Sequence, residues 1–111
     1  MAVRLEVVVD ATSLISALLG ERAIQVLFSD LFQCITTERT TWEVKRYIPT
    51  IADRSGVAEN EVLSLFETFP LTAYQSAFYE AHIDHATRQV GERDANDIDI
   101  LALTYQTGTP L

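Results

Sequence analysis

The chain has 111 residues, of which 48% are hydrophobic and 22% are charged, so it has enough apolar side chains for one folded domain and is not disordered by composition. Its net charge of −8, with Lys45 as the single lysine, argues against a protein that holds nucleic acid through many non-specific phosphate contacts. No apolar run is long enough to cross a bilayer, so we expect no membrane partner. No secretory leader is recognisable and Cys34 is the single cysteine, so we expect a cytoplasmic protein.

The first 20 residues predict a buried strand that leads directly into a helix. Residues 5–9 are nearly all apolar and mostly β-branched, which is typical of a strand buried on both faces and covering about 4–10. The strand stops at Asp10, and apolar residues at helical spacing follow from Leu14 to a helix end at Gly20. Asp10 is therefore expected at the carboxyl end of a parallel strand, where open α/β sheets bind their ligands.

Further along the chain, strand and helix patterns alternate before helices dominate. A short strand is expected at 32–35, after which Thr36 or Thr37 can cap a helix that runs to about residue 53 and that Pro49 is expected to kink or break. The remaining expected elements are a brief strand at 70–74 and helices at about 12–19, 21–29, 58–68, 76–90 and 95–106. This order predicts an α/β sandwich with a small parallel sheet.

Acidic residues at element junctions are the candidate functional groups. Asp10 follows the first strand, and Glu43 lies in the middle of a helix. Asp94, Asp97 and Asp99 surround the start of the last helix. Structural alternatives exist, because aspartates near a helix start can cap it or interact with its dipole, and Glu43 can pair with the arginine four residues before it. Two acidic junctions in one small α/β chain nevertheless suggest a divalent metal site.

The chain resembles PIN-domain ribonucleases in three segments, VVVDATSLISALL, TTWEVKRYI and RDANDIDILALTYQTGTPL. The resemblance covers essentially the whole chain and implies one PIN-like domain, residues 1–111. It implies a three-layer α/β/α sandwich with a small parallel sheet, and acids that bind Mg²⁺ or Mn²⁺. The implied activity is metal-dependent endonucleolytic hydrolysis of single-stranded RNA. An antitoxin protein is an implied partner, since such domains are often toxins of toxin–antitoxin pairs.

The resemblance also assigns catalytic acids. The strand-end acid of the family falls on Asp10 and its third acid on Asp97. Its helical glutamate falls on Glu43, with Glu38 the weaker candidate. The carboxylates of Asp10, Glu43 and Asp97 would then share a cation and lie within roughly 10 Å of one another.

Four further residues are expected around these acids. Asp94 and Asp99 flank the third acid and would assist in holding the metal. Thr12 would orient the strand-end acid or meet a phosphate oxygen, and Arg46 would contact a phosphate of the RNA.

One segment departs from the family pattern. In the family a strand with a fourth acid follows the last helix, whereas this sequence stops at Leu111, so we expect a C-terminally truncated domain. An open sheet edge would favour a homodimer, and the missing acid would make cleavage slow. Two alternatives stay open: a catalytically weak PIN-like module that acts through protein contacts, and a phosphoacceptor or nucleotide-binding domain. The latter is less favoured because the four glycines form no phosphate-binding loop.

Overall fold

The computed structural model describes residues 5–20, 23–90 and 95–109, and its elements alternate as the sequence predicts. In chain order they are β1 (Leu5–Val8), α1 (Ala11–Leu18), α2 (Ala23–Leu27), β2 (Phe32–Thr37), α3 (Glu38–Ser55), α4 (Glu59–Glu67), β3 (Leu71–Tyr74), α5 (Ser76–Tyr79), a 3₁₀ turn (Glu80–His82), α6 (Ile83–Val90) and α7 (Ala95–Thr107). None of the helices in these ranges is both long and apolar enough to cross a membrane.

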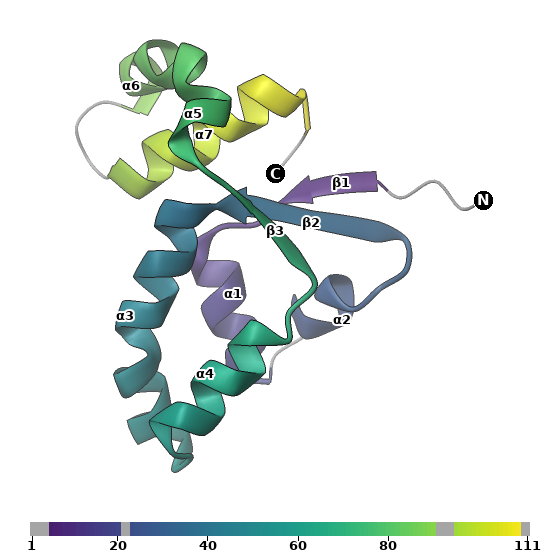
Figure 1. Ribbon diagram of the computed structural model, residues 1–111, viewed down its shortest axis with the longest axis vertical. Helices are drawn as coiled ribbons and strands as arrows, with labels where there is room; N and C mark the ends of the chain where they lie inside the picture. Colours follow the sequence, from purple (N-terminus) through teal and green to yellow (C-terminus); the bar gives the residue numbers. More distant parts are fainter. Residues whose placement is uncertain (1–4, 21–22, 91–94, 110–111) are drawn as a thin grey trace.

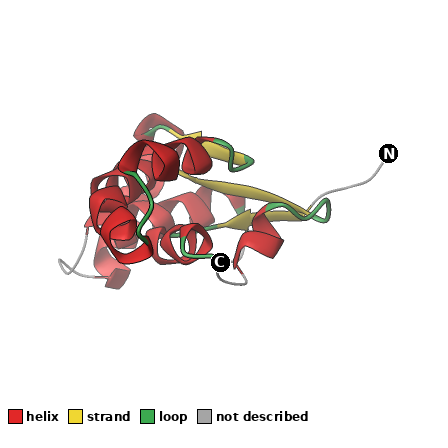
Figure 2. Cartoon of the chain, turned by 90° about the horizontal axis from the view of Figure 1, so that it is seen from below, coloured by secondary structure: helices red, strands yellow, loops and turns green. Residues whose placement is uncertain are grey.

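The three strands form one parallel sheet in the order β1-β2-β3. Val7 of β1 lies opposite Cys34 of β2, and Cys34 lies opposite Leu71 of β3. Because all strands run the same way, their carboxyl ends share one edge of the sheet, from which α1, α3 and α5 follow (Figure 1). Figure 2 shows the strands running from the side of the N-terminus toward the main group of helices.

Alternating side chains of the sheet divide the core into two layers. Val9 and Cys34 belong to a buried cluster with residues of α1–α4, whereas Val8 and Ile35 belong to a second cluster with Tyr79 and residues of α6 and α7. The helices α1–α4 therefore cover one face and α5–α7 the other, as Figure 1 shows below and above the sheet. The predicted three-layer α/β/α sandwich is confirmed.

Helix α3 is not broken at Pro49, where the sequence predicts a kink or a break. Thr37 caps the helix as predicted, accepting a hydrogen bond from the N–H of Thr40 at 3.0 Å. The helix then continues through Pro49 to Ser55, although proline removes one backbone hydrogen bond. Its apolar side chains are buried on both sides of Pro49, which is itself exposed, so packing of that face outweighs the local cost.

The predicted single helix over 76–90 is also wrong. The segment is divided into α5, a 3₁₀ turn and α6. The break lies at Tyr79, whose backbone (φ −118°, ψ 11°) leaves the α-helical region while its side chain is buried in the second layer. The helix thus breaks where the Tyr79 ring packs into the core, and the spacing of apolar residues in the sequence does not reveal this break.

Candidate functional site at the carboxyl edge of the sheet

Two hydrogen bonds fix the place where β1 and β2 end. The N–H of Val9 donates to the carbonyl oxygen of Ile35 at 2.9 Å, and Thr36 Oγ1 donates to the carbonyl oxygen of Val9 at 2.7 Å. Thr36 is fully buried, so this second bond is shielded from water. Asp10, the next residue of the chain, is therefore held beside the end of β2.

Asp10 is half-buried and caps helix α1. Its Oδ1 accepts a hydrogen bond from the N–H of Ser13 at 2.9 Å. The capping alternative for this residue is therefore confirmed, and it does not exclude a second role. A carboxylate has two oxygens, and Oδ2 of Asp10 receives no hydrogen bond from the described part of the chain. That oxygen can serve another ligand.

The end of β2 is fastened to the first turn of α3 by two threonines. Thr37 and Thr40 are both fully buried, and their Oγ1 atoms are 2.7 Å apart. The backbone N–H of Thr40 donates to the same Thr37 oxygen. A buried hydroxyl pair of this kind holds the start of α3 rigidly against the sheet, so residues on its next turns have defined positions.

Tyr79 links Asp99 of α7 to the same edge. Its hydroxyl donates to Oδ2 of the half-buried Asp99. Burial raises the pKa of Tyr79 well above its usual value, and the bonded, negatively charged Asp99 raises it further. A hydrogen bond with Thr37 and the positive charge of Arg39 act in the opposite direction on the pKa of Tyr79. The tyrosine therefore stays protonated, donates to Asp99 and lies next to the end of β2. Sequence reasoning missed this role, because an apolar pattern does not show the partner of a buried hydroxyl.

The other predicted acids have the following positions. Glu43 is half-buried on α3, and Glu38 is exposed in the first turn of that helix. Asp97 is exposed in the first turn of α7, and Asp94 lies outside the described residues. Helix α7 contacts β1, β2 and α3, and its first turn lies beside the first turn of α3 (Figure 1). The fold thus brings the elements that carry Asp10, Glu43 and Asp97 to one edge of the sheet.

The two predicted substrate-binding residues are both solvent-accessible. Thr12 is exposed in the first turn of α1, next to Asp10, and Arg46 is exposed on α3. The ion pair of Arg39 with Glu43 that the spacing allows does not form between these described residues. Arg39 instead lies where its charge acts on Tyr79.

The donor types at this edge suit a hard divalent cation, because Mg²⁺ and Mn²⁺ take carboxylate oxygens. Within the described ranges, no three or more histidine, cysteine, aspartate or glutamate side chains are grouped closely enough to hold an ion by themselves. Mg²⁺ often has only one or two carboxylate ligands and completes its shell with water and substrate phosphate, so it does not need such a group. Asp10, Glu43 and Asp97 therefore do not form such a group in the described structure, and they stay predicted ligands.

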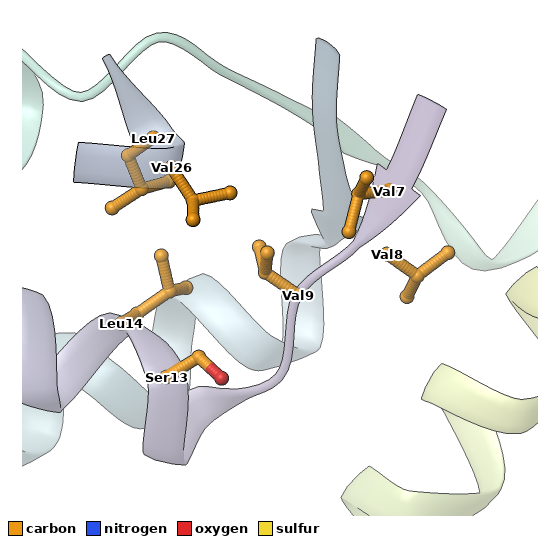
Figure 3. A pocket seen from close by; sticks show the side chains of 7 residues that line it. All are labelled: Val7, Val8, Val9, Ser13, Leu14, Val26 and Leu27. Carbon is orange, nitrogen blue, oxygen red and sulfur yellow. The ribbon is translucent and has the colours of Figure 1, made fainter. Parts of the chain in front are cut away.

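An apolar cavity of about 200 Å³ lies beside β1, and none of these acids lines it. Figure 3 shows its lining, in which Ser13 is the one polar side chain among those labelled: Val7, Val8, Val9, Ser13, Leu14, Val26 and Leu27. Such a wall offers no charged group for a phosphate or a metal. We therefore place the candidate site at the acidic edge and not in this cavity.

The chain is a small α/β domain in which a parallel sheet lies between two layers of helices. Acids are present where β1 ends and where α7 begins. Ligands of such domains bind at the carboxyl edge of the sheet. A family model described as the PIN domain matches residues 8–111, and the chain belongs to the PIN-domain family. Membership supports a nuclease-type function in general, and PIN domains generally depend on divalent metal ions and act on RNA. A comparison with curated proteins finds no match.

The Tyr79–Asp99 hydrogen bond is expected to be visible in the pH dependence of stability. At pH 7, Tyr79→Phe should lower the free energy of unfolding by about 1–2 kcal/mol, because Asp99 loses its donor. Since the pKa of Tyr79 is raised on folding, its neutral form contributes stability fully below pH ~10, and this contribution is lost as the pH rises further. Wild type should therefore lose stability above pH ~10 more steeply than Tyr79→Phe.

Urea unfolding at pH 7 and at about pH 10.5 measures this difference. The pKa of the buried Cys34 thiol is also raised, but it affects both proteins alike and cancels in the comparison. Tyr105→Phe, which changes a partly exposed tyrosine, is the matched control. Equal alkaline losses in wild type and Tyr79→Phe would show that the hydroxyl is not held as described.

Proposed function

We propose that this chain is a metal-dependent endoribonuclease that hydrolyses phosphodiester bonds of single-stranded RNA at the carboxyl edge of its sheet. The observation that carries the proposal is the convergence at this edge of the end of β1, with Asp10, and the first turns of α3 and α7. The nuclease-type function of the PIN-domain family supports it.

The acids of this edge are the proposed holders of Mg²⁺ or Mn²⁺. Asp10 and Asp97 would bind the ion directly, and Glu43 would bind it or accept a hydrogen bond from a neighbouring water. Asp94 and Asp99 would assist from beside Asp97. When bound, the ion supplies a water activated for attack and neutralises charge on the phosphate.

The chain's own side chains would position the reacting groups. The N–H of Ser13 holds one oxygen of Asp10, which directs the carboxylate toward the edge of the sheet. Tyr79 holds Asp99 in the same way. Thr12 would hydrogen-bond a phosphate oxygen or orient Asp10, and Arg46 would hold a phosphate further along the RNA.

Cleavage of matched oligonucleotides tests the proposal. With Mg²⁺ or Mn²⁺, wild type should cut an unpaired RNA internally, leave the same RNA in a duplex largely intact, and stop when EDTA removes the ion. A single-stranded DNA of equal sequence distinguishes an RNA-specific nuclease from a general one. RNA cleavage that persists undiminished in EDTA, or no cleavage with either ion, would overturn the proposal.

A catalytically weak PIN-like module that acts through protein contacts is the second candidate. Exposed apolar side chains support it, since Leu5, Phe28 and Leu31 are all largely accessible in the described structure. A homodimer or an antitoxin protein would be the partner in that case, and the buried free Cys34 fits a reducing cytoplasm. Sedimentation of the purified chain, combined with the cleavage assay, separates the two candidates.

A further inference from the structure

We propose that Trp42 and Arg46, on the exposed face of α3, form a subsite for one unpaired nucleotide of RNA. The base would stack on the indole ring of Trp42, and the adjoining phosphate would bind the guanidinium group of Arg46. This inference rests on the proposed ribonuclease function and names how that site holds its substrate.

The two side chains already form a cation–π contact. The guanidinium carbon of Arg46 lies 4.7 Å from the centre of the Trp42 ring. Trp42 nevertheless keeps 53% of its surface exposed. An aromatic ring with an arginine on its face and open area beside it is a platform on which a base can stack, and the arginine remains available to a phosphate.

The position of the pair on α3 shows that the core does not require it. The buried face of the helix consists of Thr40, Val44, Ile48, Ile51 and Ala52. Trp42 belongs to neither buried cluster of the sandwich. Trp42 is therefore not part of the core, and about half of this large aromatic side chain is open to solvent.

The subsite borders a candidate catalytic acid. Glu43, Arg46 and Tyr47 together line an open depression of about 250 Å³ on this face of α3. Glu43 and Arg46 are three residues apart, which is about 4.5 Å along a helix axis, so they lie on neighbouring turns of one face. A nucleotide held by Trp42 and Arg46 would therefore be next to Glu43.

Charge also favours an RNA at this face. The chain carries 8 basic and 16 acidic residues, but α3 alone has four of the basic ones and three of the acidic ones. The basic residues are Arg39, Lys45, Arg46 and Arg54. Arg39 lies four residues before Glu43 and Arg46 three residues after it, so cations are present on both sides of this acid along α3. The basic side chains of α3 could therefore bind phosphates of an RNA strand that extends from the acidic edge.

Trp42 is the single tryptophan of the chain, so its fluorescence reports on this subsite alone. We would titrate wild type in EDTA, which prevents metal-dependent cleavage, with an unpaired RNA of about ten nucleotides. Stacking should quench the fluorescence, and the same RNA in a duplex should quench it little because its bases are already stacked inside.

Variants identify the contacts. Binding measured with a labelled RNA should weaken about tenfold in Trp42→Ala and about three- to tenfold in Arg46→Gln, while Trp42→Phe should keep most of the affinity. Arg54→Gln removes an equal charge from the last turn of α3 and should change the affinity less than twofold. All four variants should melt close to wild type, because they change exposed side chains.

The outcomes separate this inference from the ribonuclease proposal. RNA cleavage without fluorescence quenching would overturn the subsite and leave the ribonuclease intact. Quenching with the expected variant effects, but no cleavage, would support the subsite and overturn the ribonuclease. Equal weakening by Arg46→Gln and Arg54→Gln would show non-specific charge attraction. A fluorescence change on self-association but none with RNA would make this face a protein interface. Either of these last two results would overturn the subsite.

Discussion

Replacing Asp10 with asparagine is expected to lower the rate of RNA cleavage about 100-fold or more without unfolding the protein. A 100-fold loss corresponds to about 2.7 kcal/mol of transition-state stabilisation, the scale expected when a charged metal ligand is removed. The fold should survive because asparagine keeps an oxygen that can accept the hydrogen bond from the N–H of Ser13, and it is an equally good helix cap.

Glu6→Gln is the matched control for this experiment. It removes the same charge from β1, but Glu6 is exposed and lies four residues before Asp10. Its cleavage rate should stay within about twofold of wild type. Mn²⁺ should raise the melting temperature of wild type and of Glu6→Gln but not that of Asp10→Asn, since only the first two bind the ion. Unchanged cleavage in Asp10→Asn would remove Asp10 from the catalytic site.

Leu14→Ala is expected to produce the largest loss of stability, about 3–5 kcal/mol in the free energy of unfolding. Leu14 is 0% exposed and belongs to the cluster between the sheet and α1–α4. It also lines the apolar cavity of about 200 Å³, so its truncation would enlarge an existing void (Figure 3). Loss of buried surface and cavity growth both lower stability, and their sum sets this range.

Denaturant unfolding of Leu14→Ala beside Leu31→Ala measures the effect. Leu31 is 69% exposed, so the same substitution there should change the free energy of unfolding by about 0.5 kcal/mol or less. A cost below about 1 kcal/mol for Leu14→Ala would contradict the described packing of α1 on the sheet.

Features that depend on local sequence were predictable. The strand β1, the acid at its end and the Thr37 cap each depend on residues within a few positions of one another, and the structure confirms these elements. The predicted burial of β1 on both faces is wrong, because β1 lies at an edge of the described sheet and its first residues, Leu5 and Glu6, are exposed. The three-layer fold and the PIN-domain family, which the sequence resemblance implies, are confirmed as well.

Features that depend on contacts between distant segments were not predictable. The helix continues past Pro49 because a buried face extends on both sides of it, and α5 ends at Tyr79 because that ring packs against α7. The Tyr79–Asp99 hydrogen bond joins residues that are 20 positions apart, and no periodic pattern shows such a pair. For the same reason the sequence indicates which acids follow strands or begin helices, but not the distances between their carboxylates.

The claim that Asp10, Glu43 and Asp97 share one divalent ion is tested most directly by crystals of the protein loaded with Mn²⁺. Anomalous scattering would locate the ion independently of any activity. We predict one peak at the carboxyl edge of the sheet, about 2.1 Å from oxygens of Asp10 and Asp97 and bound by Glu43 directly or through a water. A saturated crystal with no peak at this edge, or with its only peak away from these three acids, would contradict the proposed metal site.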